Sequence, residues 1–380
     1  MKKIFIRLIK ILPAFVLFIM IFAITFMGIS AEDKTYSRME NRTLQQFPKL
    51  SKQRLLKGKF QNKYETYLSD QFPKRDTWVQ IMSVSNRMLG RTEANGVYFG
   101  KKDYLLEHHT EKDFNEKTVN KNIKALQKFV KSTKKTAKVK VMMVPSKTQI
   151  LRDYLPAFAE SYDETIFYKK LEQALSSDVL IPVSDDLQKH KKETIFYKTD
   201  HHWTTLGAWY GYKSYLKSCG KSTKPADNKK EWKKVSQDFL GTTHSKVNMY
   251  STADTIFIYE PSAKMKVIYN LGEKTEHSFY QNKFLKEKDK YSVFFGGNQA
   301  LLEISGGKKN GKTLLMIKDS FANCMIPFLA EDFEKVVVAD MRQLNVGISM
   351  LLRSYQPTDV LILYNNIQFM QDTEFSMKAK

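Results

Sequence analysis

The chain contains only two cysteines, Cys219 and Cys324, among its 380 residues. Two cysteines cannot build a disulfide framework, so we expect close packing to hold the fold together. The two thiols either form a single bridge or lie buried as small apolar side chains.

Acidic residues are missing from the start of the chain. Residues 1–10 carry only basic charges, and residues 11–29 are apolar without any charge. Such a run is long enough to cross a bilayer as one helix. A basic flank of this kind stays in the cytoplasm, which predicts a single-pass signal anchor with the body outside the cell. The alternative is a cleaved signal peptide, which would leave the body secreted.

Nucleic-acid modules are also missing, although the formal net charge is +22. The basic residues do not form an arginine-rich cluster or a zinc-finger pattern, and an exported body would not meet nucleic acid. We therefore expect no nucleic-acid partner. Solvated lysine faces explain the charge, and an anionic envelope polymer or lipid headgroup is the partner that suits the location.

Residues 30–90 are predicted to form a juxtamembrane helical segment. Two amphipathic helices are indicated by apolar side chains at helical spacing, which we expect to form core. These side chains are Phe60, Tyr64, Tyr67 and Leu68 in one helix and Trp78, Ile81, Met82 and Leu89 in the other. A hairpin is expected over residues 95–107, turning near Gly100.

Residues 91–375 alternate between helical patterns and short apolar runs. The apolar runs lie at residues 139–145, 179–184, 314–318, 335–339 and 359–364. Helices are expected at residues 119–130, 165–175, 321–329 and 346–354. Continuous β-branched strands that alternate with helices predict an α/β fold of three layers, with a mostly parallel sheet covered on both faces. Residues 221–291 are rich in lysine and aromatic side chains and are predicted to be an insertion over the sheet edge.

The segment Thr199–Thr204 reads TDHHWT and precedes a helical pattern. In an extended segment, Asp200 and His202 point to one side and His201 to the other. Asp200 can then orient the imidazole of His202, and His201 is a bystander. Thr204 or Thr205 is expected to cap the next helix.

A nucleophile is indicated at Ser320, where the buried strand that ends in Lys318 and Asp319 is followed at once by a helix. A strand-to-helix turn exposes a serine hydroxyl and offers it the N–H groups of the helix terminus. An ordinary helix cap is the alternative for a serine considered alone. Together with an Asp-x-His segment, Ser320 becomes a candidate member of a catalytic triad.

These blocks resemble the DHHW proteins, a branch of the SGNH-hydrolase superfamily related to the alginate O-acetylation proteins. The resemblance rests on TDHHWT, KDSFANCMIPFL, VVVADMR and DVLILYN, with ENRTLQQFP, DQFPKRD and NGVYFGKK earlier in the chain. In that family the Asp-x-His pair precedes the serine, as Asp200 and His202 precede Ser320 here. Lys318 stands where a glycine is frequent in the wider superfamily.

The resemblance implies Ser320 as nucleophile, His202 as general base and Asp200 as its partner. Substrate contacts are implied for Arg342, Asn323, Tyr364 and Trp203. For Trp203, packing beneath the loop is the main expectation and sugar stacking the alternative. Gly297 or Asn298 could add an oxyanion donor or simply form a turn. No metal and no cofactor are expected.

The implied function is acetyl transfer to a polysaccharide of the cell envelope or a secreted one, on the outward-facing side of the cell membrane. A membrane-bound O-acyltransferase is the expected acetyl donor. A carbohydrate esterase or deacetylase and a non-catalytic glycan-binding envelope protein are the alternatives. Asp-His-His is also a motif of manganese-dependent phosphoesterases, but the Asp-x-Asp motif that accompanies it there is not found upstream of Asp200.

Overall fold

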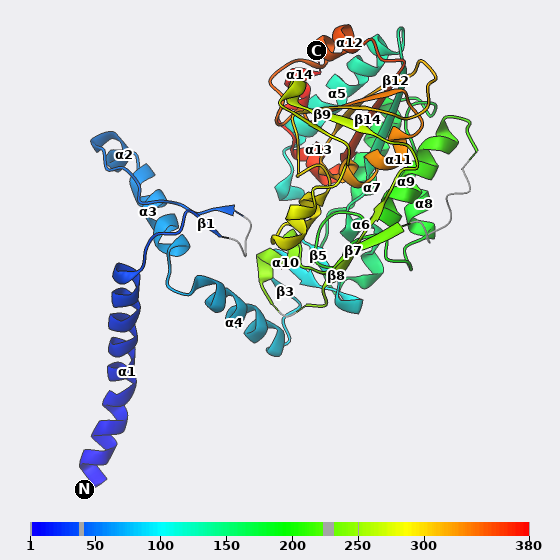
Figure 1. The fold of residues 1–380 in the computed structure, drawn as a ribbon. Coiled ribbons are helices and arrows are strands. Elements are labelled where there is room, and N and C mark those ends of the chain that lie inside the picture. Colours follow the sequence, from blue (N-terminus) through cyan, green and yellow to red (C-terminus); the bar gives the residue numbers. More distant parts are fainter. Residues whose placement is uncertain (1, 38–41, 223–231, 250, 380) are drawn as a thin grey trace. The chain divides into compact units, whose positions relative to one another are not determined.

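The computed structural model describes residues 2–37, 42–222, 232–249 and 251–379. Its contacts divide the chain into two compact units, drawn in Figure 1. The first comprises Met1–Leu89 and Val247–Met249, and the second comprises Gly90–Lys246 and Tyr250–Lys380. Each unit is described by itself.

A mixed sheet of seven strands forms the centre of the second unit as described, in the order β10-β9-β11-β13-β12-β14-β6. The strands β6, β14, β12 and β13 run parallel, whereas β11, β9 and β10 are antiparallel to their neighbours. Their bounds are β6 Lys138–Val144, β9 Lys266–Tyr269, β10 Lys274–Glu276, β11 Leu301–Ser305, β12 Thr313–Lys318, β13 Lys335–Ala339 and β14 Asp359–Asn365. The predicted α/β class is confirmed, with an antiparallel extension at one edge.

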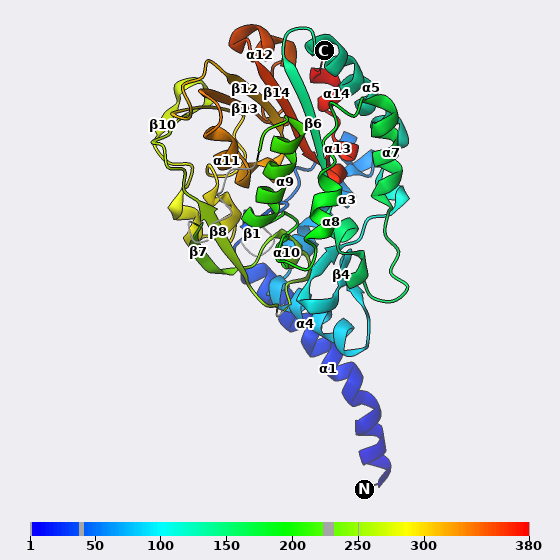
Figure 2. The same ribbon diagram turned by 90° about the vertical axis from the view of Figure 1, so that its right-hand side faces the viewer.

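Helices cover both faces of this sheet (Figure 2). In β12, Leu314 and Met316 join the core on one face, whereas Leu315 and Ile317 join the core on the other. Residues 314–317 are all apolar, and the alternation of side chains along the strand produces these two cores. The α-helices that begin in the second unit, not all of which lie on the sheet, are α5 Glu116–Thr133, α6 Lys147–Ile150, α7 Glu164–Ala174, α8 Val183–Lys189, α9 Thr205–Ser218, α10 Thr242–Val247, α11 Ile326–Ala330, α12 Ile348–Tyr355, α13 Asn366–Gln371 and α14 Phe375–Lys378.

Smaller elements complete the second unit. The expected hairpin is present as β4 and β5, with β3 added beside β4. Two of the strands from the middle of the chain, β7 and β8, form a separate antiparallel pair. The bounds are β3 Glu93–Ala94, β4 Val97–Phe99, β5 Leu105–Glu107, β7 Trp232–Phe239 and β8 Asp254–Tyr259. The 3-10 helices are η1 Lys101–Asp103, η2 Glu111–Asp113, η3 Arg152–Tyr154, η5 Asn270–Gly272, η6 Asn282–Lys286, η7 Lys290–Val293 and η8 Ser320–Cys324.

The strand predicted at residues 179–184 is wrong. Leu180 forms a single isolated parallel bridge with Val141 of β6, and this bridge does not extend into a ladder of paired residues. Pro182, which has no N–H to donate, stands at the N-cap of α8, so the chain turns into a helix instead of continuing the sheet.

The first unit contains one long apolar helix, α1 Lys2–Ser30, and three shorter ones. Residues Ile11–Ser30 of α1 are long and apolar enough to cross a membrane, a property that anchors and signal sequences share. The shorter helices are α2 Lys52–Leu56, α3 Lys59–Asp70 and α4 Arg75–Met88, and two short strands, β1 Tyr36–Ser37 and β2 Arg42–Thr43, pair with each other.

The apolar stripes of α3 and α4 do not form the predicted core. Six of the eight side chains are exposed, namely Tyr64, Leu68, Trp78, Ile81, Met82 and Leu89. Helical periodicity indicates that one face will be covered, but it does not identify what covers it. Within the described part of the first unit, Phe47 packs against Tyr64 and Tyr67, but most of the two stripes stays exposed.

Candidate active site

Ser320 lies where the central strand β12 ends. The strand stops at Lys318, and Asp319 caps the 3-10 helix η8 by accepting a hydrogen bond from Phe321 N at 2.9 Å. The second oxygen of Asp319 accepts from Asn365 N at 2.7 Å, which ties the turn to the end of β14. The predicted strand-to-helix turn is therefore present, although two short helices, η8 and α11, replace the single helix expected over residues 321–329.

Asp200 and His202 lie in the loop that precedes α9. Thr204 caps this helix, as expected, by accepting a hydrogen bond from Gly207 N. His202 Nδ1 lies 2.6 Å from Asp200 Oδ1, and His202 Nε2 lies 2.8 Å from Ser320 Oγ. The structure thus brings together three side chains from two segments 118 positions apart in the sequence, in the geometry of a nucleophile, a base and an orienting carboxylate.

Burial shapes the protonation of this pair. Burial and the neighbouring His201 lower the pKa of His202 below its ordinary value, although the Asp200 carboxylate opposes that shift. Burial works against the charge on Asp200, but His202, His201 and the hydrogen bond from Thr242 outweigh it and hold the pKa of Asp200 well below its usual range. Asp200 is therefore a carboxylate and His202 is neutral at physiological pH, which is the state that a general base requires.

The second oxygen of Asp200 is held by Thr242, at the start of α10. Thr242 N and Thr242 Oγ1 donate to Asp200 Oδ2 at 2.8 Å and 2.9 Å. The preceding Gly241 makes this approach feasible, because a Cβ at that position would lie 2.3 Å from the Cβ of Asp200. The sequence patterns did not single out either residue.

Lys147 holds the loop that carries Asp200 through hydrogen bonds to its backbone carbonyl groups. Its buried Nζ donates to the carbonyl oxygens of Asp200, Tyr197 and Lys198 at 2.8, 3.0 and 3.1 Å. Burial lowers the pKa of Lys147 to about 8, although Asp254, Glu107 and Asp200 favour its charged form. Lys147 therefore satisfies three carbonyl groups that face away from solvent, a role without a local sequence signal.

Tyr291 fixes the imidazole plane. Its ring stacks on His202 with centroids 3.9 Å apart and an interplanar angle of 12°. Its hydroxyl donates to the carbonyl oxygen of Ser320 at 3.1 Å. Tyr291 therefore links His202 and Ser320 from a part of the sequence that was predicted only as an insertion.

His201 is not the bystander that the alternation rule predicts. The segment around it bends, so it does not follow the two-residue alternation of a strand. The His201 and His202 rings lie 3.9 Å apart, and His201 Nδ1 shares a 2.6 Å hydrogen bond with Thr242 Oγ1. His201 lines the cavity beside Ser320.

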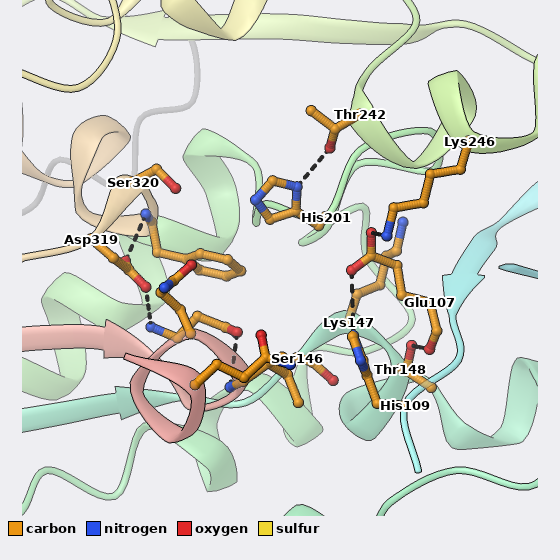
Figure 3. Close-up of a pocket in the computed structure, with 15 residues that line it drawn as sticks. Glu107, His109, Ser146, Lys147, Thr148, His201, Thr242, Lys246, Asp319 and Ser320 are labelled. Carbon is orange, nitrogen blue, oxygen red and sulfur yellow. Dashed lines mark hydrogen bonds and ion pairs between the residues drawn. The ribbon is translucent and has the colours of Figure 1, made fainter. Parts of the chain in front are cut away.

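The cavity in front of Ser320 has a volume of about 290 Å³ (Figure 3). Glu107 and Lys246 form an ion pair of 2.8 Å in its wall, and His109 lies 3.5 Å from the other oxygen of Glu107. The lining residues are Glu107, His109, Ser146, Lys147, Thr148, His201, Thr242, Lys246, Asp319, Ser320, Phe321, Asn365, Ile367, Gln368 and Gln371. A polar wall of this kind suits a hydroxylated ligand.

Four residues were expected to contact substrate, namely Arg342, Asn323, Tyr364 and Trp203. Among the described residues, none of these four lines the cavity. Trp203 is fully buried, donates to Phe321 O at 2.7 Å and packs so closely on Gly211 that a Cβ there would lie 2.7 Å from its ring. Tyr364 is fully buried as well. Trp203 thus supports the turn from one core, whereas Tyr364 packs against Phe369 and Phe375 in the other.

Asn323 and Arg342 belong to a buried polar cluster around Lys318. Lys318 Nζ donates to Asn323 and Asn298 at 2.9 and 3.1 Å and lies 3.4 Å from Asp340. Arg342 contacts the same Asp340 with two hydrogen bonds of 2.9 and 2.6 Å. Lys318 is thus paired with Asp340 beneath the turn, and Asn298 acts there as an acceptor, away from the cavity lining.

Asp200, His201 and His202 also place ligand atoms within 4.8 Å of one another, as a metal ion requires. In the described structure these atoms are hydrogen-bonded to one another, to Thr242 and to Ser320. A metal on His202 Nε2 would displace the contact with Ser320, so metal ligation and the serine contact exclude each other at that nitrogen.

Comparison with known proteins identifies the family and the fold of this chain. The sequence profile of the family described as DHHW protein matches residues 110–339, which contain Asp200, His202 and Ser320. A DHHW family protein from Eubacterium siraeum has a TM-score of 0.64 and 23% identity, over 75% of this chain and 96% of that chain. PatB1 from Bacillus cereus has a TM-score of 0.60 and 18% identity, over 73% of this chain and 98% of that chain.

A more distant likeness is to the O-acetyltransferase domain of Pseudomonas putida AlgJ, at 12% identity over 75% of this chain and 98% of that chain. Its TM-score of 0.46 is too low to carry an argument. The two structures with TM-scores above 0.5 show that this chain has an SGNH-like fold, and they show nothing finer. A search among curated proteins finds no match.

Thr242 provides a test of how Asp200 is held. Thr242→Val removes the hydroxyl that donates to the carboxylate and keeps the shape of the side chain. A hydrogen bond to a charged group contributes about 1.5–3 kcal/mol, so kcat/KM for an acetyl ester should fall between roughly tenfold and a hundredfold. Thr242→Ser retains the hydroxyl and should retain most of the activity. Equal rates for the valine variant and the parent would contradict this role.

The pH profile of kcat/KM tests the state of His202. A base must be unprotonated, and the lowered pKa means that activity should stay constant from neutral pH down to about 6, below the ordinary value of roughly 6.5. Activity should fall only as the pH drops further through the lowered pKa. His201→Gln removes a neighbouring imidazole that lowers the pKa of His202, so it should shift this acid limb upward. An acid limb of the parent above the ordinary value would contradict the assignment.

Proposed function

We propose that this chain, which belongs to the DHHW family, is an acyl-transferring enzyme that uses Ser320 as nucleophile, His202 as base and Asp200 as its orienting partner. The observation that carries the proposal is the continuous hydrogen-bonded series Asp200–His202–Ser320, with distances of 2.6 and 2.8 Å, at the edge of a polar cavity. An ordinary helix cap does not require a buried histidine and carboxylate in line with its hydroxyl.

In the proposed first step, Ser320 Oγ attacks the carbonyl carbon of an acetyl ester while its proton moves to His202 Nε2. The tetrahedral intermediate collapses, the donor alkoxide leaves with that proton, and the acetyl group remains on Ser320. An acceptor hydroxyl then gives its proton to His202 and takes the acetyl group, which restores the free serine.

The negatively charged oxygen of the tetrahedral intermediate needs hydrogen-bond donors to stabilise it. The N–H of Ser320 opens η8, where the first N–H groups of a helix lack acceptors within the helix, and no described residue accepts from it. We assign this group to the oxyanion. The buried Lys318–Asp340–Arg342 cluster beneath the turn keeps the backbone of Lys318 to Ser320 in place for that task.

Acetyl transfer to a polysaccharide is the reaction that we favour. Sugar hydroxyls are natural acceptors for a cavity lined by Ser146, Thr148, Gln368 and Gln371. The resemblance of TDHHWT and KDSFANCMIPFL to the DHHW proteins favours the same acceptor class, because that family is related to the alginate O-acetylation proteins. The apolar helix α1 suits an anchor at the membrane surface, where a membrane-bound O-acyltransferase would deliver the acetyl group.

The test combines one substitution with a change of acceptor. The full chain, purified in detergent, should release the chromophore from an acetyl ester, and Ser320→Ala should reduce that rate by at least about a thousandfold because the nucleophile is lost. Ser349→Ala, a serine on α12, serves as the matched control. The melting temperature of both variants should stay near that of the parent.

Adding an oligosaccharide distinguishes transfer from hydrolysis. Mass spectrometry should find acetyl groups on the oligosaccharide when the parent is present and not when Ser320→Ala replaces it. Turnover that yields acetate alone would identify an esterase, and unchanged turnover by Ser320→Ala would overturn the nucleophile. Loss of activity with EDTA would instead favour a metal at Asp200, His201 and His202.

A further inference from the structure

The segment that follows the apolar helix carries an unusual run of positive charge. Residues 49–63 contain six basic residues and no acidic residue. All six are exposed, and no ion pair joins them to a described carboxylate. These residues, which we call the basic run, are Lys49, Lys52, Arg54, Lys57, Lys59 and Lys63.

Large apolar side chains are interleaved with the basic run and are equally uncovered. Leu50 is 70% exposed and Leu56 is 78% exposed, and Phe47 is 59% exposed. Burial of such side chains against their own unit is the usual outcome in a water-soluble domain. Cations and exposed apolar groups within one short segment are the composition of helices that lie in a membrane interface.

An aromatic cluster accompanies the basic run. Phe47 packs edge-on against Tyr64 and Tyr67, with centroids 5.9 and 5.3 Å apart, and Phe60 stacks on Tyr64 at 5.9 Å. Amphipathic aromatic rings are enriched at the level of lipid headgroups. The cluster therefore adds a second interfacial feature on α3.

Hydrogen bonds hold α3 close to the end of α1. Lys34 N donates to Gln71 Oε1 at 2.9 Å, Gln71 Nε2 donates back to Lys34 O at 2.9 Å, and Tyr67 Oη donates to Asp33 Oδ1 at 3.0 Å. Because α1 ends at Ser30, these contacts lie three to four residues from its end. A chain of that length spans at most about 14 Å, so the end of α3 lies near the bilayer surface if α1 crosses the bilayer.

We infer that residues 47–63 form an interfacial device that docks on anionic lipid headgroups, with the leucines and Phe47 entering the headgroup layer. The charge is complementary to such a surface, and the covalent and hydrogen-bonded connection to α1 brings the segment within reach of it. This inference does not depend on the chemistry at Ser320. Docking of residues 47–63 would hold the chain at a fixed distance from the membrane surface, whereas α1 alone would leave that distance variable.

The experiment uses the full chain in vesicles of brominated lipid, with Leu56→Trp as a fluorescent reporter. Trp78→Phe in the same background removes the tryptophan that is 43% exposed in α4. In vesicles of phosphatidylglycerol and phosphatidylcholine, the introduced indole should be quenched and its emission shifted to the blue. In pure phosphatidylcholine, or at high salt, quenching should fall because the charge attraction is lost or screened.

Two charge variants complete the design. Replacing all six cations of the basic run by glutamine should abolish the quenching, since each cation near an anionic surface strengthens attachment roughly fivefold. The matched control replaces six exposed lysines of the second unit, along and just after α5, by glutamine. This control should leave the quenching unchanged. These control positions are Lys117, Lys121, Lys124, Lys128, Lys131 and Lys135.

Other outcomes overturn the inference. A reporter indole that stays unquenched in every vesicle would place the segment in water. Blue-shifted emission that is the same in detergent and in both lipids, without bromine quenching, would show that protein covers position 56, whether the second unit or another copy. Equal loss of quenching in the two charge variants would mean that net charge, and not this segment, is responsible.

Discussion

The arrangement of the site depends on one buried carboxylate. Asp200 is withdrawn from water, and each of its oxygens has a partner: Oδ1 faces His202, and Oδ2 accepts twice from Thr242. A buried charge without such partners would be costly, so the loop, the start of α10 and Lys147 must all be in place before the imidazole is oriented. Orientation of His202 then depends on tertiary structure as much as on the two residues beside it.

A second buried charge cluster supports the other half of the site. Lys318 and Arg342 share the carboxylate of Asp340 beneath the turn that presents Ser320. The cluster explains how a lysine can be buried at the end of β12. Its ammonium points into a polar site in the interior, while its backbone continues into the turn. The two clusters meet at the 2.8 Å contact between His202 and Ser320.

The sequence predicts those parts of this arrangement that local pattern encodes. Continuous apolar runs indicate β6, β12, β13 and β14, and Thr204 before a helical stripe indicates the start of α9. Thr242, Lys147 and Tyr291 could not be found in this way, because each acts through contacts with residues distant in the sequence. The alternation rule placed His201 wrongly because the segment bends. Periodicity alone also could not show that the stripes of α3 and α4 are uncovered.

The most direct test of the central claim is to trap the acyl group. The full chain is mixed with an acetyl ester, quenched in acid within the first turnover and digested, and the peptides are weighed by mass spectrometry. The account predicts one added acetyl group on the peptide that contains Ser320, and none when His202 is replaced by alanine. An acetyl group on another residue, or turnover without any acetylated peptide, would contradict it.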